Sequence, residues 1–225
     1  MSQTLNPPAA LAAPPARPAS RLLPAAGIAA GPLFLAAGLA QGLTRDGFDF
    51  TRNALSQLSL GDLGWIQVTA FLLTGPLVIA GAIAIRRALR DTPGGTWAPR
   101  LLAVFGASFL VAGVFRADPG AGFPAGAPED RVASLSGHGT VHMLAGTVGY
   151  LALCAAFLVI GRHFAFRRQR GWALATRLLP VGVLAGFAAS AATVAAFTAG
   201  AGLGLLGLSV VTARLVAATP PPVRP

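Results

Sequence analysis

The sequence predicts an all-α protein of the polytopic membrane class, a transmembrane bundle of six helical spans with both termini in the cytoplasm. Of its 225 residues, 54% are hydrophobic and only 11% are charged, whereas about 25% of the residues of an average soluble domain are charged. The mean hydropathy is +0.67, and the apolar residues fall into long runs separated by short charged segments. Because so little charge cannot cover a soluble globule, the apolar residues must face a bilayer.

Six of these runs are long enough to cross a membrane. A hydrocarbon core of about 30 Å requires roughly 20 mostly apolar residues per helix. The fifth and sixth runs are separated only by Gly200, Ala201 and Gly202, which predicts a tight helical hairpin turn there. The predicted spans are approximately 23–43, 63–85, 98–115, 139–160, 173–199 and 203–218.

These spans form one predicted transmembrane domain, residues 22–218, between two tails. Residues 1–21 are rich in Ala and Pro without apolar periodicity, and residues 219–225 are similar, so we expect both to be disordered cytoplasmic tails. Within the spans, several glycines are four residues apart, a spacing that lets helices approach closely. We expect these glycines to pack within the bundle, with a dimer interface as the alternative: Gly27 and Gly31, Gly182 and Gly186, Gly200 and Gly204.

The arginines predict the orientation of the bundle. All 17 basic residues are Arg, and a cytoplasmic N-terminus places 13 of them on the cytoplasmic side and 4 outside, as the positive-inside rule requires. The net charge of +10 is therefore a topology signal and indicates lipid contact, with no nucleic-acid partner. We predict a multi-pass protein of the plasma membrane, and the Ala-rich, Lys-free composition favours a bacterial source. The acidic residues outside are Asp46, Asp49, Asp62, Asp118, Glu129 and Asp130.

The candidate site lies in the two outer loops. The first, 44–64, contains Arg52, Asp62 and a short amphipathic piece, Asn53–Leu60, expected to lie at the membrane interface or over the bundle. The second loop starts with Arg116 and Asp118 and leads to His138 and His142 at the outer start of the fourth span. An ionisable residue at that depth is a functional candidate. We predict a ligand-binding cluster of Arg52, Asp62, Arg116, Asp118, His138 and His142.

Two chemical interpretations of the histidines stay open. His138 and His142 are four residues apart and share a helix face, so with Asp118, or with Asp62, they could bind a divalent metal such as zinc. Alternatively, they form hydrogen bonds that close the outer end of the bundle. Neither a haem nor a nucleotide is expected. The two histidines share one helix, whereas axial haem ligands approach from opposite sides of the iron.

The chain resembles the bacterial membrane family called domain of unknown function 998. The resemblance covers roughly residues 25–218 and is carried by three elements: Ala54–Ser59 leading into Gly61 and Gly64-Trp65; Gly113-Val114-Phe115-Arg116-Ala117-Asp118-Pro119; and His138-Gly139-x-x-His142. It implies a small integral membrane protein with an outward-facing polar cluster. It implies no established reaction.

Three functions are consistent with these features of the sequence. The first is a non-enzymatic protein that binds a lipid or small amphiphile through the outward-facing polar cluster. The second is a metal-dependent intramembrane hydrolase of a lipid substrate, in which the metal would activate water. The third is a structural or transporter-associated subunit that works as a homo-oligomer.

Overall fold

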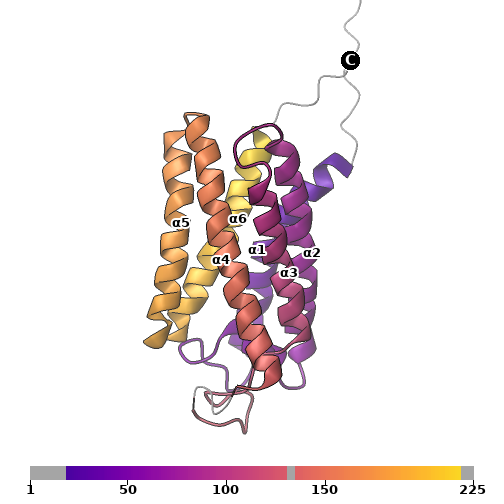
Figure 1. Cartoon of the computed structure of the whole chain (residues 1–225). Helices are drawn as coiled ribbons and strands as arrows, with labels where there is room; N and C mark the ends of the chain where they lie inside the picture. The colour runs from indigo at the N-terminus through magenta and orange to yellow at the C-terminus, as the bar shows by residue number, and fades with distance from the viewer. Residues whose placement is uncertain (1–18, 131–134, 219–225) are drawn as a thin grey trace, which may run out of the picture.

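The computed structural model describes residues 19–130 and 135–218, and these fold into six long helices (Figure 1). Two short 3-10 helices join them, and the described residues form no β-strand. All six long helices have the length and hydropathy needed to cross a membrane, which confirms the predicted all-α bundle of six spans. The elements are α1 (Ala19–Thr44), η1 (Leu55–Ser59), α2 (Gly64–Ala88), α3 (Trp97–Val114), α4 (Gly137–Phe166), α5 (Arg170–Ala188), η2 (Ala189–Ala191) and α6 (Val194–Ala217).

The boundary between the fifth and sixth helices differs from the prediction. The chain turns at residues 189–193, whereas the hairpin turn expected at 200–202 lies inside α6. Thr193 explains the turn, because its backbone is extended and its hydroxyl accepts a hydrogen bond from the N–H of Ala195 at the start of α6. Gly200 remains helical and packs against Gly186 of α5. The predicted N-terminal tail also ends earlier, since α1 begins at Ala19; the rest of both tails lies outside the described residues.

The helices form a closed ring in chain order, in which each packs against the next and α6 packs back against α1. A glycine allows close approach at each of the six interfaces, because an added Cβ would collide with the neighbouring helix. The predicted glycine pairs thus pack within the bundle. The contacts are Gly27 with Gly81, Gly75 with Gly106, Gly149 with Ser108, Gly161 with Arg177, Gly186 with Gly200 and Gly31 with Leu205.

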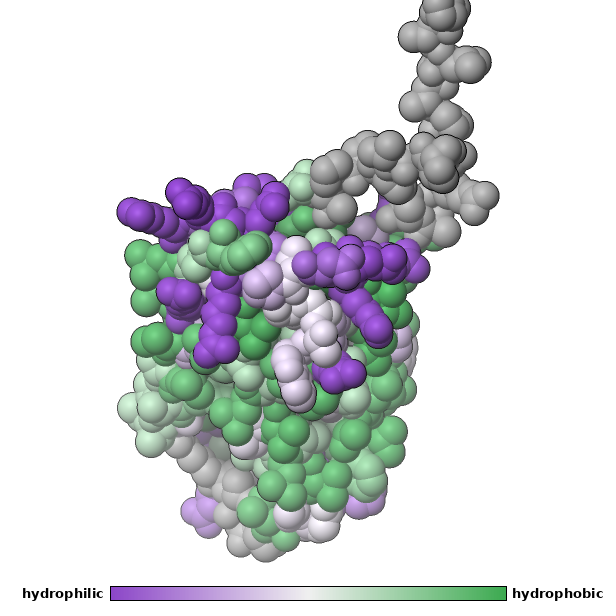
Figure 2. Space-filling view, turned by 45° about the horizontal axis from the view of Figure 1, so that its top comes forward, coloured by the Kyte–Doolittle hydropathy of each residue, from purple (hydrophilic) through white to green (hydrophobic). Residues whose placement is uncertain are grey.

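The two ends of the bundle differ in chemistry. At one end, which we call the basic end, arginines such as Arg86, Arg87, Arg162 and Arg167 gather beside the start of α1 and the end of α6. Figure 2 shows this hydrophilic cluster above a predominantly apolar outer surface. The opposite end, the loop end, carries a first loop of residues 45–63 and a second loop of residues 115–136. The candidate site residues all come from the loop end.

Candidate functional site

Arg45, the first residue after α1, holds the first loop together and contacts the second loop. Its guanidinium donates to the carbonyls of Leu58 and Leu60, both at 2.6 Å, and lies 4.9 Å from the ring centre of Phe123 in the second loop. Partial burial lowers the pKa of Arg45, and the charge of the exposed Asp62 opposes that shift. Asp62 is thus close enough to Arg45 for the two charges to interact.

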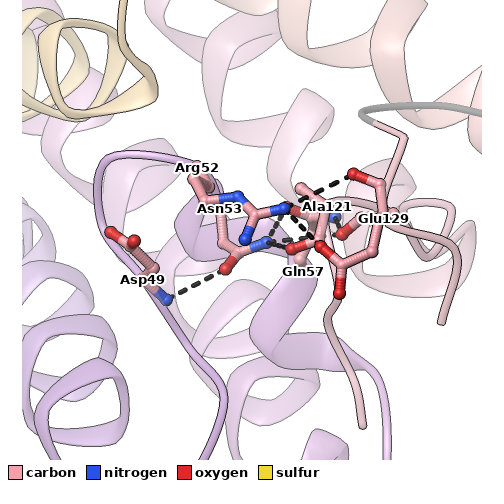
Figure 3. Close-up of polar contacts among 7 residues, drawn as sticks. Asp49, Arg52, Asn53, Gln57, Ala121 and Glu129 are labelled. Atoms are coloured by element: carbon pink, nitrogen blue, oxygen red, sulfur yellow. Dashed lines mark hydrogen bonds and ion pairs between the residues drawn. The ribbon is translucent and has the colours of Figure 1, made fainter. Parts of the chain in front are cut away.

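Two neutral amides join the first loop to the second (Figure 3). The buried Asn53 donates to the carbonyls of Gly120 and Ala121, both at 3.3 Å. The side chain of Gln57 donates to the carbonyl of Gly120 at 3.1 Å and accepts from the N–H of Ala54 at 3.0 Å. Arg45, Asn53 and Gln57 are not among the residues predicted from the sequence. The available signal was the run Asn53–Leu60, in which polar residues are interspersed with leucines.

Arg52 forms an ion pair with Glu129 at the surface of the two loops (Figure 3). The distance is 2.6 Å, and the two side chains are 48% and 79% exposed. The hydrogen bond and charge of Glu129 raise the pKa of Arg52. Exposed pairs contribute little to stability because water and salt screen them. The pair therefore holds Arg52 in place at the loop end more than it stabilises the fold.

Asp118 and Ser136 build the start of α4. One carboxylate oxygen of Asp118 accepts from the Ser136 hydroxyl at 2.6 Å, and the other accepts from the Ser136 N–H at 2.9 Å. The Ser136 oxygen in turn accepts from the N–H of Gly139 at 2.9 Å, which caps the helix. A side chain at position 139 would collide with the Asp118 carboxylate. The Gly139 between the two histidines therefore lets Asp118 reach the helix.

His142 lies one turn deeper and faces α3. Its Nδ1 lies 2.8 Å from the carbonyl oxygen of Phe115 and 3.2 Å from that of Ala112. The ring is 7% exposed and packs edge-on against Phe71 at 5.9 Å between ring centres. The carbonyls of Ala112 and Phe115 belong to the last turn of α3 and its C-cap, which helix geometry leaves without intrahelical partners. His142 thus supplies a donor for the open end of α3.

Two of the other predicted residues, His138 and Arg116, lie away from His142. His138 is exposed and its ring lies 5.2 Å from that of Phe115, while Arg116 is also exposed. Within residues 19–130 and 135–218, no three or more His, Cys, Asp or Glu side chains form a group that could hold a metal ion. The carbonyls of Ala112 and Phe115 occupy Nδ1 of His142, and Ser136 bonds both oxygens of Asp118. In the described residues, the three predicted zinc ligands His138, His142 and Asp118 are therefore not gathered into a metal-binding group.

A cavity of about 440 Å³ lies in the half of the bundle nearer the loop end. Cavities of this size suit small ligands, which need about 300 to 1,000 Å³. Residues of all six helices line it, and the first loop forms its end wall, tied down by a 2.9 Å hydrogen bond from the N–H of Val194 to the carbonyl of Thr51. The polar lining includes Arg52, Gln57, Asp118 and His142; the aromatic lining is Phe34, Phe71, Phe109, Tyr150, Phe187 and Phe197.

The cavity opens sideways between α4 and the α5–α6 pair. At the basic half of the bundle, Gly161 of α4 touches Arg177 of α5. Toward the loop end α4 leans away from α5 (Figure 1), and no atom lies within 4 Å of a Cβ placed on Gly146. Met143 lines the cavity and is also 60% exposed. The opening therefore lies on the apolar flank of α4.

Comparison with known families gives a match over most of the chain. The family described as "Protein of unknown function (DUF998)" matches residues 28–219, which is most of the chain. The match agrees with the resemblance over residues 25–218. Comparisons with curated proteins and with solved structures give no match.

Proposed function

The chain belongs to this family of unknown function, and we propose that it binds a lipid or small amphiphile in the cavity at the loop end. The observation that carries the proposal is the lining of the cavity. Most of its wall is apolar and includes six aromatic rings, and the polar side chains of Arg52, Gln57, Asp118 and His142 come from the loop end or from the turns beside it. An amphiphile has the same division, with an apolar chain and one polar end.

The direction of the opening supports the same proposal. The first loop covers the end of the cavity, while the flank at Met143 and Gly146 is open. A ligand that enters along this flank comes from among the acyl chains of the bilayer, where lipids and amphiphiles concentrate. The positive-inside rule places the loop end outside the cell, so we propose that the cavity serves the outer leaflet of the plasma membrane.

The hydrolase alternative has weaker support. It needs a metal to activate water, and the part of the chain that the structure describes brings no three metal-ligating side chains together. The polar groups around the cavity instead bond one another and the backbone. We therefore propose binding without hydrolysis.

A substitution at Gly146, which lines the cavity, tests the proposal. A Gly146→Leu substitution adds a side chain in open space at the cavity, so the helix bundle should fold while the ligand loses its place. Gly171→Leu is the matched control, because an added Cβ there also meets no atom within 4 Å and the residue does not line the cavity. The measurement is native mass spectrometry of the full-length chain purified in a mild non-ionic detergent.

The expected result is a bound lipid or amphiphile on the wild type and on Gly171→Leu, with at least a tenfold lower occupancy on Gly146→Leu. Equal occupancy on all three proteins would show that the lipid sits elsewhere and would overturn the proposal. The absence of any bound amphiphile on the wild type, even after incubation with lipid extract, would overturn it as well.

A further inference from the structure

His142 has one ring nitrogen whose role the fold does not explain. Its Nδ1 lies within hydrogen-bond distance of two backbone carbonyls, those of Ala112 and Phe115. A carbonyl oxygen can only accept a hydrogen bond, so Nδ1 must carry a proton. In a neutral imidazole the other nitrogen, Nε2, then has a lone pair and is an acceptor.

This acceptor has no partner in the part of the chain that the structure describes. Within the described residues no group forms a hydrogen bond with Nε2, and Nε2 is not among the side-chain polar atoms that the protein encloses without a partner. The His142 side chain is more than nine-tenths buried, at 7% exposure, and it lines the cavity. The accessible face of this buried ring is therefore the face toward the cavity.

The neighbouring polar groups are already engaged. Both carboxylate oxygens of Asp118 accept from Ser136, and Gln57 uses its amide oxygen on Ala54 and its amide nitrogen on Gly120. Arg52 carries donors only. Among the four polar residues named above, His142 is the one that offers an acceptor with no partner in the described chain.

We infer that Nε2 of His142 accepts a hydrogen bond from the polar group of the ligand, which is an amphiphile with a hydroxyl or amine N–H. This inference rests on the proposed function and specifies the chemistry of its ligand. The polar group lies at His142, and the apolar chain lies against the aromatic wall that Tyr150, Phe187 and Phe197 form, with ring centres 5.1 and 4.7 Å apart. An amphiphile without a hydrogen-bond donor packs its chain against the same aromatic wall but leaves Nε2 without a hydrogen bond.

Two probes with the same chain separate these cases: hexadecanol, which has a hydroxyl donor, and hexadecyl methyl ether, which has none. Binding is measured by native mass spectrometry on the full-length chain after exchange of co-purified lipid. One hydrogen bond between uncharged groups makes a difference of about five- to tenfold in affinity. We therefore expect the wild type to bind the alcohol about five- to tenfold more tightly than the ether.

His142→Asn is the informative variant. The amide nitrogen of Asn can take the place of Nδ1 and donate to the carbonyl of Phe115, whereas the acceptor at the position of Nε2 is lost. We expect this variant to bind the ether as the wild type does and to bind the alcohol no better than the ether. Circular dichroism and thermal unfolding are used to check that the variant is folded before its binding is measured.

The outcomes distinguish the two proposals. If the wild type binds both probes equally, or if folded His142→Asn keeps its preference for the alcohol, the role of His142 is overturned while amphiphile binding stands. If neither probe binds the wild type and no lipid depends on Gly146, both proposals fail. The comparison of probes on the wild type remains decisive even if His142→Asn does not fold.

Discussion

Asp118 joins the end of α3 to the start of α4 through Ser136. Its two hydrogen bonds, at 2.6 and 2.9 Å, orient the serine that caps α4. The carboxylate also lies where the first N–H groups of the helix give a partial positive charge, which stabilises an anion. Asp118 therefore has a structural role at the site, whatever ligand the cavity takes.

Substitution of Asp118 tests this role. We expect Asp118→Ala to lower the free energy of unfolding by about 1 to 2 kcal/mol, because it removes two hydrogen bonds and frees the helix cap. The measurement is thermal or denaturant unfolding in detergent, followed by circular dichroism. Asp46→Ala is the control, since Asp46 is an exposed acid of the first loop. Equal stability of the two variants would contradict the role of Asp118.

Residues of the loop end differ in how far the sequence predicts them. Asp118 and His142 stand out in the sequence because ionisable groups are rare near apolar runs, and the structure places both at the cavity. Arg45, Asn53 and Gln57 bond backbone carbonyls, some more than sixty residues away in the chain. A carbonyl partner carries no side-chain signature, so sequence patterns could not indicate these contacts.

At the scale of elements, the α5–α6 hairpin shows that a glycine-rich run does not by itself predict where a turn lies. A Gly-Ala-Gly run predicts a turn by local propensity, but Gly200 is needed inside α6, where its Cα and the backbone of Gly186 are in close contact. Glycine is common both in turns and at tight helix interfaces in membranes. The neighbouring helix decides between these roles, and the neighbour is a tertiary feature.

The α1–α2 interface allows a direct test of close packing. A Cβ placed on Gly81 would lie 2.7 Å from the Cα of Gly27, so neither position tolerates a side chain without separating the helices. We expect Gly27→Leu to lower the free energy of unfolding by about 1 to 3 kcal/mol through overpacking. Gly171→Leu is the matched control in open space. Unfolding curves in detergent check the difference; identical curves would show that α1 and α2 pack elsewhere.

At the scale of the whole molecule, both ends of the described bundle lie on the same side, as an even number of spans requires (Figure 1). The arginines gather at this side, and the two loops with most of the acids lie at the other. The ring of helices encloses the cavity only in the half nearer the loops. The orientation in the membrane therefore decides which leaflet and which compartment the cavity serves.

Cysteine labelling measures that orientation. In a Cys154→Ala background, which removes the buried native thiol, a cysteine at Asp46 reports on the loop end and one at Ala165 on the basic end; both positions are exposed. We expect a membrane-impermeant maleimide to label Asp46→Cys in intact cells and to label Ala165→Cys only after the membrane is opened. The reverse pattern would invert the predicted topology and place the cavity on the cytoplasmic side.

The sequence by itself determined the six-helix membrane architecture, the approximate spans and the family, because hydropathy and charge act locally along the chain and need no partner. Tertiary structure decided which glycines pack and where the α5–α6 turn falls. It also decided that Asp118 bonds Ser136 at the start of α4 and that His142 bonds the carbonyls at the end of α3. The cavity likewise exists only because α4 leans away from α5 toward the loop end. These features depend on the distance between segments far apart in the chain, which no local pattern contains.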